Sequence, residues 1–180
     1  MKTKFLFTFA FLVLVLSASE VIPQNLSVEK IEGISNMFRF EKMYLCGQPN
    51  LETLEWLKGQ GVDLVVNLRT KSENDEFSQA AFNEEKTVGK LGMAYISIPV
   101  GGNRAYSVEN LDKFIKALST SYNKVLVHCR GCGRVTHFMM AYLVKEKGYS
   151  VDDAVSVGKQ LTFTLPLENL LGQEVTMSFK

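Results

Sequence analysis

The sequence carries no excess of either charge. Its 180 residues hold 20 Lys and Arg against 19 Asp and Glu, which gives a formal net charge of +1. This balance excludes the basic surplus that is typical of nucleic-acid-binding proteins. Internal repeats and low-complexity runs are also absent, and 46% of the residues are hydrophobic. A chain of this length and composition is typical of one globular domain with a sizeable core.

Long hydrophobic runs are scarce, and only the N-terminal one approaches a membrane span. The run FLFTFAFLVLVL follows Lys2 and Lys4 and precedes Ser17-Ala18-Ser19. A basic start, a short apolar stretch and small residues predict a secretory signal peptide over residues 1–19. The alternative is an uncleaved anchor, but the run is short for a span of about 20 residues. Cleavage removes two lysines and leaves 18 basic against 19 acidic residues, a net charge of −1.

The rest of the chain divides into a lead-in segment, residues 20–40, and one domain, residues 41–180. Apolar strands are predicted at 43–46, 62–68, 93–100 and 125–128. Helices are predicted at about 50–59, about 79–90, from 107, at 133 to about 147, and from 150, whereas the polar stretch 69–79 is expected to be non-helical. Alternating strands and helices predict an α/β fold, a parallel sheet with helices on both faces.

Three polar segments follow predicted strands, namely residues 69–77, 101–107 and 129–134. Ligands of parallel sheets bind beyond the carboxyl ends of the strands. We therefore expect these three segments to lie close together. The last of them, CRGCGR, has the most distinctive chemistry.

Cys129 is expected at the end of a buried strand and just before a helix. The free N–H groups and the positive dipole end of that helix, together with Arg130 and Arg134, favour its thiolate form, and His128 can orient the loop. Gly131 and Gly133 allow successive N–H groups to point inward around a tetrahedral anion. The Arg134 guanidinium can bind two oxygens of a phosphate at once. A thiolate in that position predicts attack on phosphorus and a phosphocysteine intermediate.

These residues carry a resemblance to a known family. HCRGCGR resembles the His-Cys…Arg phosphate loop of protein tyrosine and dual-specificity phosphatases. The closer similarity is to a bacterial branch described as tyrosine-phosphatase-like or β-lactamase-hydrolase-like. That branch shares Gly47-Gln48-Pro49, Asn67-Leu68-Arg69, the strand Gly92–Val100, the stretch VLVHC and the segment SVDDAVSVGKQLTFTLPLENL. The resemblance runs from about Glu41 and implies a cysteine-phosphatase-like fold without a cofactor.

Two features depart from the best-known phosphatases. Four residues rather than five separate Cys129 from Arg134, and Val135 rather than Ser or Thr follows the arginine. The aspartate that serves as general acid after the third strand is missing from Val100-Gly101-Gly102-Asn103, and its loss can cost roughly 10²–10⁴ in rate. Substitutes come from the following polar segment and helix, and the candidates are Glu73, Asp75, Glu76 and Glu84.

A second cysteine in the loop leaves other functions open. Cys129-Arg-Gly-Cys132 is a C-x-x-C at a helix start, which is also the pattern of thiol–disulfide oxidoreductases. Rhodanese-type sulfurtransferases also have a short cysteine loop. Cys132 could instead trap Cys129 as a reversible disulfide. The His and Cys residues here lack metal-ligand spacing, so no metal site is predicted.

The sequence therefore predicts an exported, periplasmic or secreted, phosphoric monoester hydrolase. Cys129 would be the nucleophile, His128 would tune its thiol, and Arg134 would hold the phosphate. The backbone of the loop would complete the phosphate site, through Arg130, Gly131, Cys132, Gly133 and Arg134. The expected partner is a phosphorylated protein, lipid, sugar or nucleotide, with no nucleic acid and, after cleavage, no membrane. The alternatives are a sulfurtransferase or redox protein and a non-catalytic anion-binding module.

Overall fold

The structure is a computed structural model that describes residues 26–120, 122–162 and 167–174. The predicted signal peptide lies outside these residues. None of the helices in this described part combines the length and the apolar character that a bilayer span needs.

One six-stranded sheet organises the fold, in the order β1-β2-β3-β6-β4-β5. Four neighbouring strands are parallel, and β1 and β2 add an antiparallel edge. The strands are β1 (Glu29–Lys30), β2 (Met37–Phe40), β3 (Met43–Cys46), β4 (Val62–Asn67), β5 (Ala94–Ser97) and β6 (Lys124–His128). The two antiparallel strands fall within the segment expected to be a lead-in, residues 20–40, so this segment contributes to the sheet.

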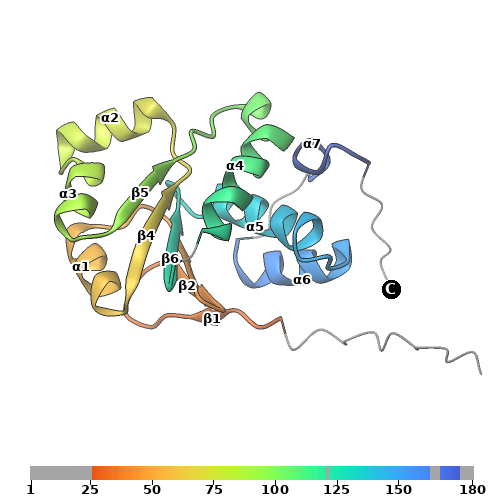
Figure 1. Cartoon of the computed structure of the whole chain (residues 1–180), viewed down its shortest axis with the longest axis horizontal. Coiled ribbons are helices and arrows are strands. Elements are labelled where there is room, and N and C mark those ends of the chain that lie inside the picture. Colours follow the sequence, from red (N-terminus) through yellow and green to blue (C-terminus); the bar gives the residue numbers. More distant parts are fainter. Residues whose placement is uncertain (1–25, 121, 163–166, 175–180) are drawn as a thin grey trace, which may run out of the picture.

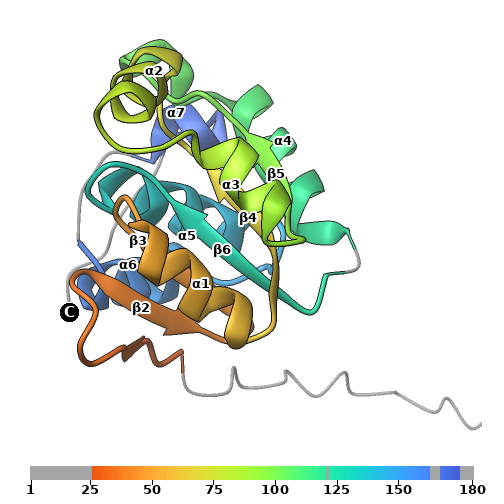
Figure 2. The ribbon, with the colours of Figure 1, turned by 90° about the vertical axis from the view of Figure 1, so that its left-hand side faces the viewer.

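Helices cover both faces of the sheet, and the predicted α/β class is confirmed. The helices are α1 (Leu51–Gly59), α2 (Lys71–Ala80), α3 (Glu84–Lys90), α4 (Val108–Ser119), α5 (Gly133–Lys145), α6 (Val151–Gln160) and α7 (Glu168–Leu171), with a 3₁₀ turn η1 (Asn103–Ala105). Figure 1 shows α1 and α3 on one side of the strands and α4 to α7 on the other. In Figure 2, turned by 90°, α1 and α3 lie in front of the sheet.

Side chains of the central strands point alternately to the two faces of the sheet, and this produces two hydrophobic cores. In β6, Val125 and Val127 join the core under α4, α5 and α6, whereas Leu126 joins the core under α1 and α3. All three side chains are at most 1% exposed. Successive side chains of a strand point to opposite faces, so an unbroken apolar run is what a sheet covered on both faces requires.

The polar stretch after β4 corrects one prediction. Residues 71–80 form the helix α2, which was not predicted. The helix predicted at about 79–90 is shorter than expected and forms α3, Glu84–Lys90. The Thr70 hydroxyl accepts the Glu73 N–H and the Glu73 carboxylate accepts the Thr70 N–H, a capping box that begins α2. None of the residues of α2 is buried, so the helix lacks the apolar stripe from which helices are usually recognised. Asn83 caps α3.

The third predicted strand is shorter than expected. β5 covers Ala94–Ser97, not residues 93–100. The Ile98 N–H still donates to the Asn67 carbonyl (2.9 Å) and the Val100 N–H to the Leu68 carbonyl (3.3 Å), so the chain continues beside β4. Pro99 has no N–H, which interrupts the ladder.

The packing of α6 on α5 generates a test. A Cβ on Gly158 would lie 3.2 Å from Met140 Cγ and even nearer its sulfur, and both residues are fully buried. We expect Gly158→Ala to lower the free energy of unfolding by about 1–3 kcal/mol through overpacking. The matched Gly89→Ala, on the exposed face of α3 with no atom within 4 Å, should raise it by about 0.5–1 kcal/mol. Urea unfolding measures both, and equal effects would contradict the packing described.

Candidate active site

The loop from Cys129 to Arg134 connects β6 to α5 at the carboxyl edge of the sheet. The Cys129 side chain is 1% exposed, and its N–H donates to the Cys46 carbonyl at 3.4 Å. The turn after β3 braces the loop, because the Gln48 N–H donates to the Arg130 carbonyl (3.1 Å) and Gly47 bridges Gly131. A Cβ on Gly47 would lie 3.0 Å from that carbonyl. The close approach explains the glycine in this turn.

Cys132 adopts a strained conformation at the start of α5. It is the N-cap residue with φ +73°, in the left-handed region that favours glycine, and its side chain is fully buried. This conformation costs a non-glycine residue roughly 1–2 kcal/mol. Its carbonyl accepts both the N–H (3.0 Å) and the hydroxyl (3.2 Å) of Thr136, which holds the strained turn in place.

The three cysteines, Cys46, Cys129 and Cys132, are free thiols and lie near one another. Burial raises the pKa of Cys132 to about 12, and the charge of a Cys129 thiolate adds to this rise. Burial likewise raises the pKa of Cys46, with further contributions from Cys132 and Cys129. Cys46 and Cys132 are therefore neutral thiols at neutral pH. The disulfide between Cys129 and Cys132 stays a prediction.

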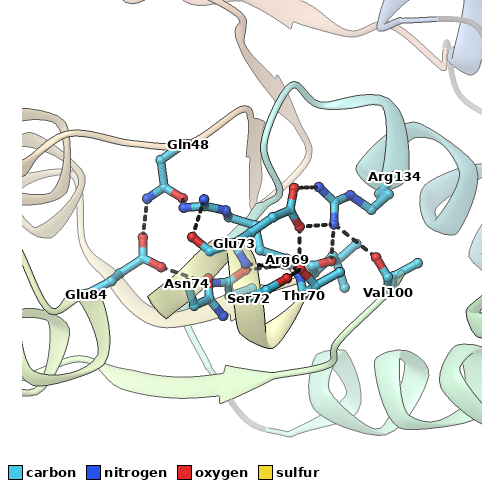
Figure 3. A network of polar contacts seen from close by, with 11 residues as sticks. Gln48, Arg69, Thr70, Ser72, Glu73, Asn74, Glu84, Val100 and Arg134 are labelled. Carbon is cyan, nitrogen blue, oxygen red and sulfur yellow. Dashed lines mark hydrogen bonds and ion pairs between the residues drawn. The ribbon is translucent and has the colours of Figure 1, made fainter. Parts of the chain in front are cut away.

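Arg134 connects the chain after β4, the chain after β5 and the loop after β6. Its Nη1 and Nη2 donate to the two carboxylate oxygens of Glu73, at 2.6 and 2.7 Å. Nη1 also donates to the Val100 carbonyl (2.9 Å) and the Leu68 carbonyl (3.2 Å), as drawn in Figure 3. The segment 69–77 and the loop 129–134 thus meet at one guanidinium, as expected, whereas the contact from the chain after β5 is made by Val100, just before the expected segment 101–107.

The ion pair with Glu73 uses only one edge of the Arg134 guanidinium. Glu73 occupies the Nη1–Nη2 edge, so a bound phosphate would have to use the Nε–Nη2 edge, which has the same fork geometry. The pKa of Arg134 is raised first by Glu73 and also by a Cys129 thiolate. The cysteine sulfur is therefore close enough to act on the guanidinium, and an anion bound there would lie near it.

Glu73 is ionised in this arrangement. Its hydrogen bonds with Arg134 are the largest influence and, with those to Thr70, lower its pKa from 4.5 to about 2. Such a carboxylate holds no proton to donate at neutral pH. Among the other acids named as candidates, Asp75 pairs with Lys71 (2.6 Å) on the exposed side of α2, and Glu76 is exposed on the same helix.

A second polar network lies behind the loop and contains Glu84. The Glu84 carboxylate accepts hydrogen bonds from Gln48 Nε2 and Asn67 Nδ2, both at 2.8 Å, and lies 3.3 Å from His128 Nε2. Burial raises the pKa of Glu84, but the His128 charge and hydrogen bond, with Gln48 and Arg69, outweigh it and lower the pKa overall. Glu84 is therefore an ionised partner of His128.

Arg69 belongs to the same network. Its guanidinium donates to the Gln48 side-chain oxygen and to the Glu73 carbonyl, and it lies over the Phe77 ring at 5.2 Å. The side chain is 6% exposed, so it braces the turn after β3 against α2 (Figure 3). Among the described residues, no group of three or more His, Cys, Asp or Glu side chains could hold a metal ion.

Sequence reasoning missed two contributors to this site. Gln48 entered only through the resemblance, yet it joins Arg69, Glu84 and the loop. Tyr106 was not singled out, although it falls in the expected segment 101–107. Its ring contacts the rings of His137 and Phe138 in α5, with centroids 5.2 and 6.2 Å away.

A family of known proteins matches this chain over residues 18–167, the DSP-PTPase phosphatases fused to NAD+ kinase. The chain belongs to this PTP-NADK family. The resemblance stated from the motifs is thereby confirmed.

Individual relatives agree with the family. The chain is 30% identical to mouse protein phosphatase Slingshot homolog 1 over 131 residues, which is 67% of this chain and 11% of that protein. It is 29% identical to a β-lactamase hydrolase-like protein of Xylella fastidiosa over 107 residues, 59% of this chain and 23% of that one. The chain thus spans a small part of the length of these relatives.

A solved structure supports the fold. A DUF442 protein of Shewanella putrefaciens CN-32 superposes with a TM-score of 0.59 at 28% identity, covering 78% of this chain and 91% of the other. The structure of kinase associated phosphatase, which has a catalytic-site cysteine, superposes with a TM-score of 0.58 at 17% identity, covering 67% of this chain and 75% of the other. The chain therefore has the fold of a cysteine-type phosphatase.

The Glu73–Arg134 pair predicts a pH dependence of stability. The folded pKa of Glu73, about 2, lies below the ordinary value of 4.5, so its stabilising effect is complete above pH 4.5 and is lost as the pH falls toward 2. The effect amounts to at most about 3 kcal/mol. We expect Glu73→Gln to lower the free energy of unfolding at pH 7 by about 2 kcal/mol and to flatten its decline in acid, as measured by urea unfolding.

The exposed neighbour Glu76 provides the control. Glu76→Gln, on the same helix, should change the free energy of unfolding by less than about 0.5 kcal/mol. An acid profile of Glu73→Gln as steep as that of the unmodified protein would contradict the assigned pairing.

Proposed function

We propose that this chain is a cysteine-dependent phosphatase that hydrolyses phosphomonoesters. One observation carries the proposal. Cys129 follows β6 and begins the loop that leads into α5, and the charge of a Cys129 thiolate acts on Arg134, whose Nη1–Nη2 edge is held by Glu73. Membership of a phosphatase family supports the same chemistry.

The first step transfers the phosphoryl group to sulfur. The Cys129 thiolate attacks phosphorus, the S–P bond forms and the ester P–O bond breaks, so that the leaving oxygen departs with the bonding electron pair and becomes an alcohol or phenol on gaining a proton. The backbone N–H groups from Arg130 to Arg134, at the positive end of α5, would bind the phosphoryl oxygens. Arg134 would bind two of them through its free edge. His128, held near Glu84 at 3.3 Å, would tune the thiol from the strand side.

The second step releases phosphate. Water attacks phosphorus, the S–P bond breaks and the Cys129 thiolate is restored, with inorganic phosphate as the product. The same loop would stabilise the charge in both transition states. We propose that this reaction takes place after export to the periplasm or the exterior, because the N-terminal residues have the pattern of a signal peptide.

A thiol–disulfide function is the second candidate, and the state of Cys132 favours it. Cys132 is fully buried, neutral and held in a strained turn three residues after Cys129. Strain that persists at a candidate site points to a role for that residue. In this alternative Cys132 would resolve a mixed disulfide formed by Cys129.

Turnover of p-nitrophenyl phosphate under reducing conditions tests the proposal. We expect hydrolysis by the full mature chain and a loss of at least about 10³-fold in Cys129→Ser, because the nucleophile is removed. Cys132→Ser should retain turnover. Cys46→Ala, a matched buried thiol outside the loop, should stay within about threefold of the unmodified protein.

Two outcomes would contradict the phosphatase proposal. Loss of disulfide-reductase activity in both Cys129→Ser and Cys132→Ser, with no phosphate release by any variant, would favour the redox function. Binding of inorganic phosphate without turnover would indicate a non-catalytic anion-binding module.

A further inference from the structure

The proposed reaction needs a proton for the leaving oxygen, and the nearby carboxylates do not supply one. Glu73 and Glu84 are ionised through their pairs with Arg134 and His128. The chain between β5 and α4 reads IPVGGNRAYS and contains no Asp or Glu. An alkoxide or phenoxide of high pKa leaves slowly unless it is protonated. The proton donor is therefore not one of these carboxylic acids.

Tyr106 is a neutral donor at the same edge of the sheet. It lies between η1 and α4, in the chain that continues from the Val100 carbonyl bound by Arg134. Its ring packs edge-on against His137 at 5.2 Å, on the helix that begins at the phosphate loop. The half-buried side chain is thus held against α5 by aromatic contacts.

The charges of the site act on the Tyr106 hydroxyl. Burial raises its pKa above the usual value of 10, a Cys129 thiolate and the Glu73 carboxylate raise it further, and Arg134 opposes them. The phenol is therefore protonated at neutral pH. The ring contacts with His137 and Phe138 place Tyr106 beside the first turns of α5, the helix that carries Arg134, and the charges of Cys129, Arg134 and Glu73 all act on its hydroxyl.

We propose that Tyr106 is the general acid of the reaction, in place of a carboxylate. As Cys129 attacks and the P–O ester bond breaks, the phenolic proton passes to the leaving oxygen, and the resulting phenolate is stabilised by Arg134. In the second step the phenolate takes a proton from the attacking water as the S–P bond breaks. Both groups return to their starting states. This inference rests on the proposed phosphatase function.

The choice of donor sets the class of substrate that gains from it. A phenol with a pKa near or above 10 protonates leaving groups that are at least as basic, such as the phenolate of tyrosine, with a pKa of about 10. It adds little for p-nitrophenolate, a weakly basic anion that leaves unaided. Tyr106 therefore favours aryl and alkyl phosphates with basic leaving groups.

Two substrates measured with Tyr106→Phe test the inference. We expect kcat for phosphotyrosine to fall by about 10²-fold, while kcat for p-nitrophenyl phosphate stays within about threefold. The phenyl ring keeps the contacts with His137 and Phe138, so the fold should persist. Tyr122→Phe, at the opposite end of β6, is the matched control and should leave both rates unchanged.

Each other outcome overturns the inference. Equal losses for the two substrates would mean that Tyr106 only supports the loop, and no loss for either would mean that another group donates the proton. Absence of p-nitrophenyl phosphate turnover in the unmodified protein would remove the proposed function as well. A series of aryl phosphates with the unmodified protein gives an independent readout, because a rate that falls steeply with leaving-group pKa would show that no acid operates.

Discussion

The carboxyl edge of this sheet depends on how one arginine is neutralised. A guanidinium keeps its charge at all relevant pH values, so a largely buried one has to be paired and hydrogen-bonded. Arg134 meets this requirement through Glu73 and the carbonyls of Leu68 and Val100. These partners follow two different strands, and Arg134 follows a third. The ion pair therefore sets the positions of α2 and of the chain after β5 relative to the cysteine loop.

The need to pair buried charges also decides which residues can donate a proton. Glu73 is ionised in its pair with Arg134, and its neighbours lower the pKa of Glu84. Both carboxylates position other groups, and neither carries a proton at neutral pH. The chain after β5 contains no aspartate, so the proposed proton donor to the leaving oxygen is the neutral hydroxyl of Tyr106. The charge distribution, rather than the number of acids near the loop, decides which residue can act as an acid.

Much of the fold could be predicted from the sequence, because the signals were local. Continuous apolar runs marked β4 and β6, and the helices predicted to start at about 50, at 107 and at 150 do begin there, at the N-caps Asn50, Ser107 and Ser150. The segment after β4 was missed because α2 buries none of its residues. Thr70 and Glu73, spaced as a capping box, were the signal that could have found it.

The site could be predicted only in part. Cys129 and Arg134 lie in one short motif, whereas Glu73 and Arg134 are 61 residues apart and meet only through the fold. Local spacing cannot show which acid pairs with the arginine. The left-handed turn at Cys132 was hidden for a similar reason, since cysteine has no preference for that conformation and Thr136 stabilises it from the next turn.

The proposed reaction depends on a tetrahedral oxyanion bound near Cys129 by the edge of Arg134 that Glu73 does not occupy. Calorimetric titration of tungstate into the Cys129→Ser protein, with and without Arg134→Lys, measures this binding, and Arg39→Lys in an exposed pair with Glu29 is the control. A lysine supplies a point charge without the fork, so Arg134→Lys should raise Kd at least about tenfold while the control leaves it unchanged. An unchanged Kd in Arg134→Lys would show that the guanidinium does not bind the oxyanion.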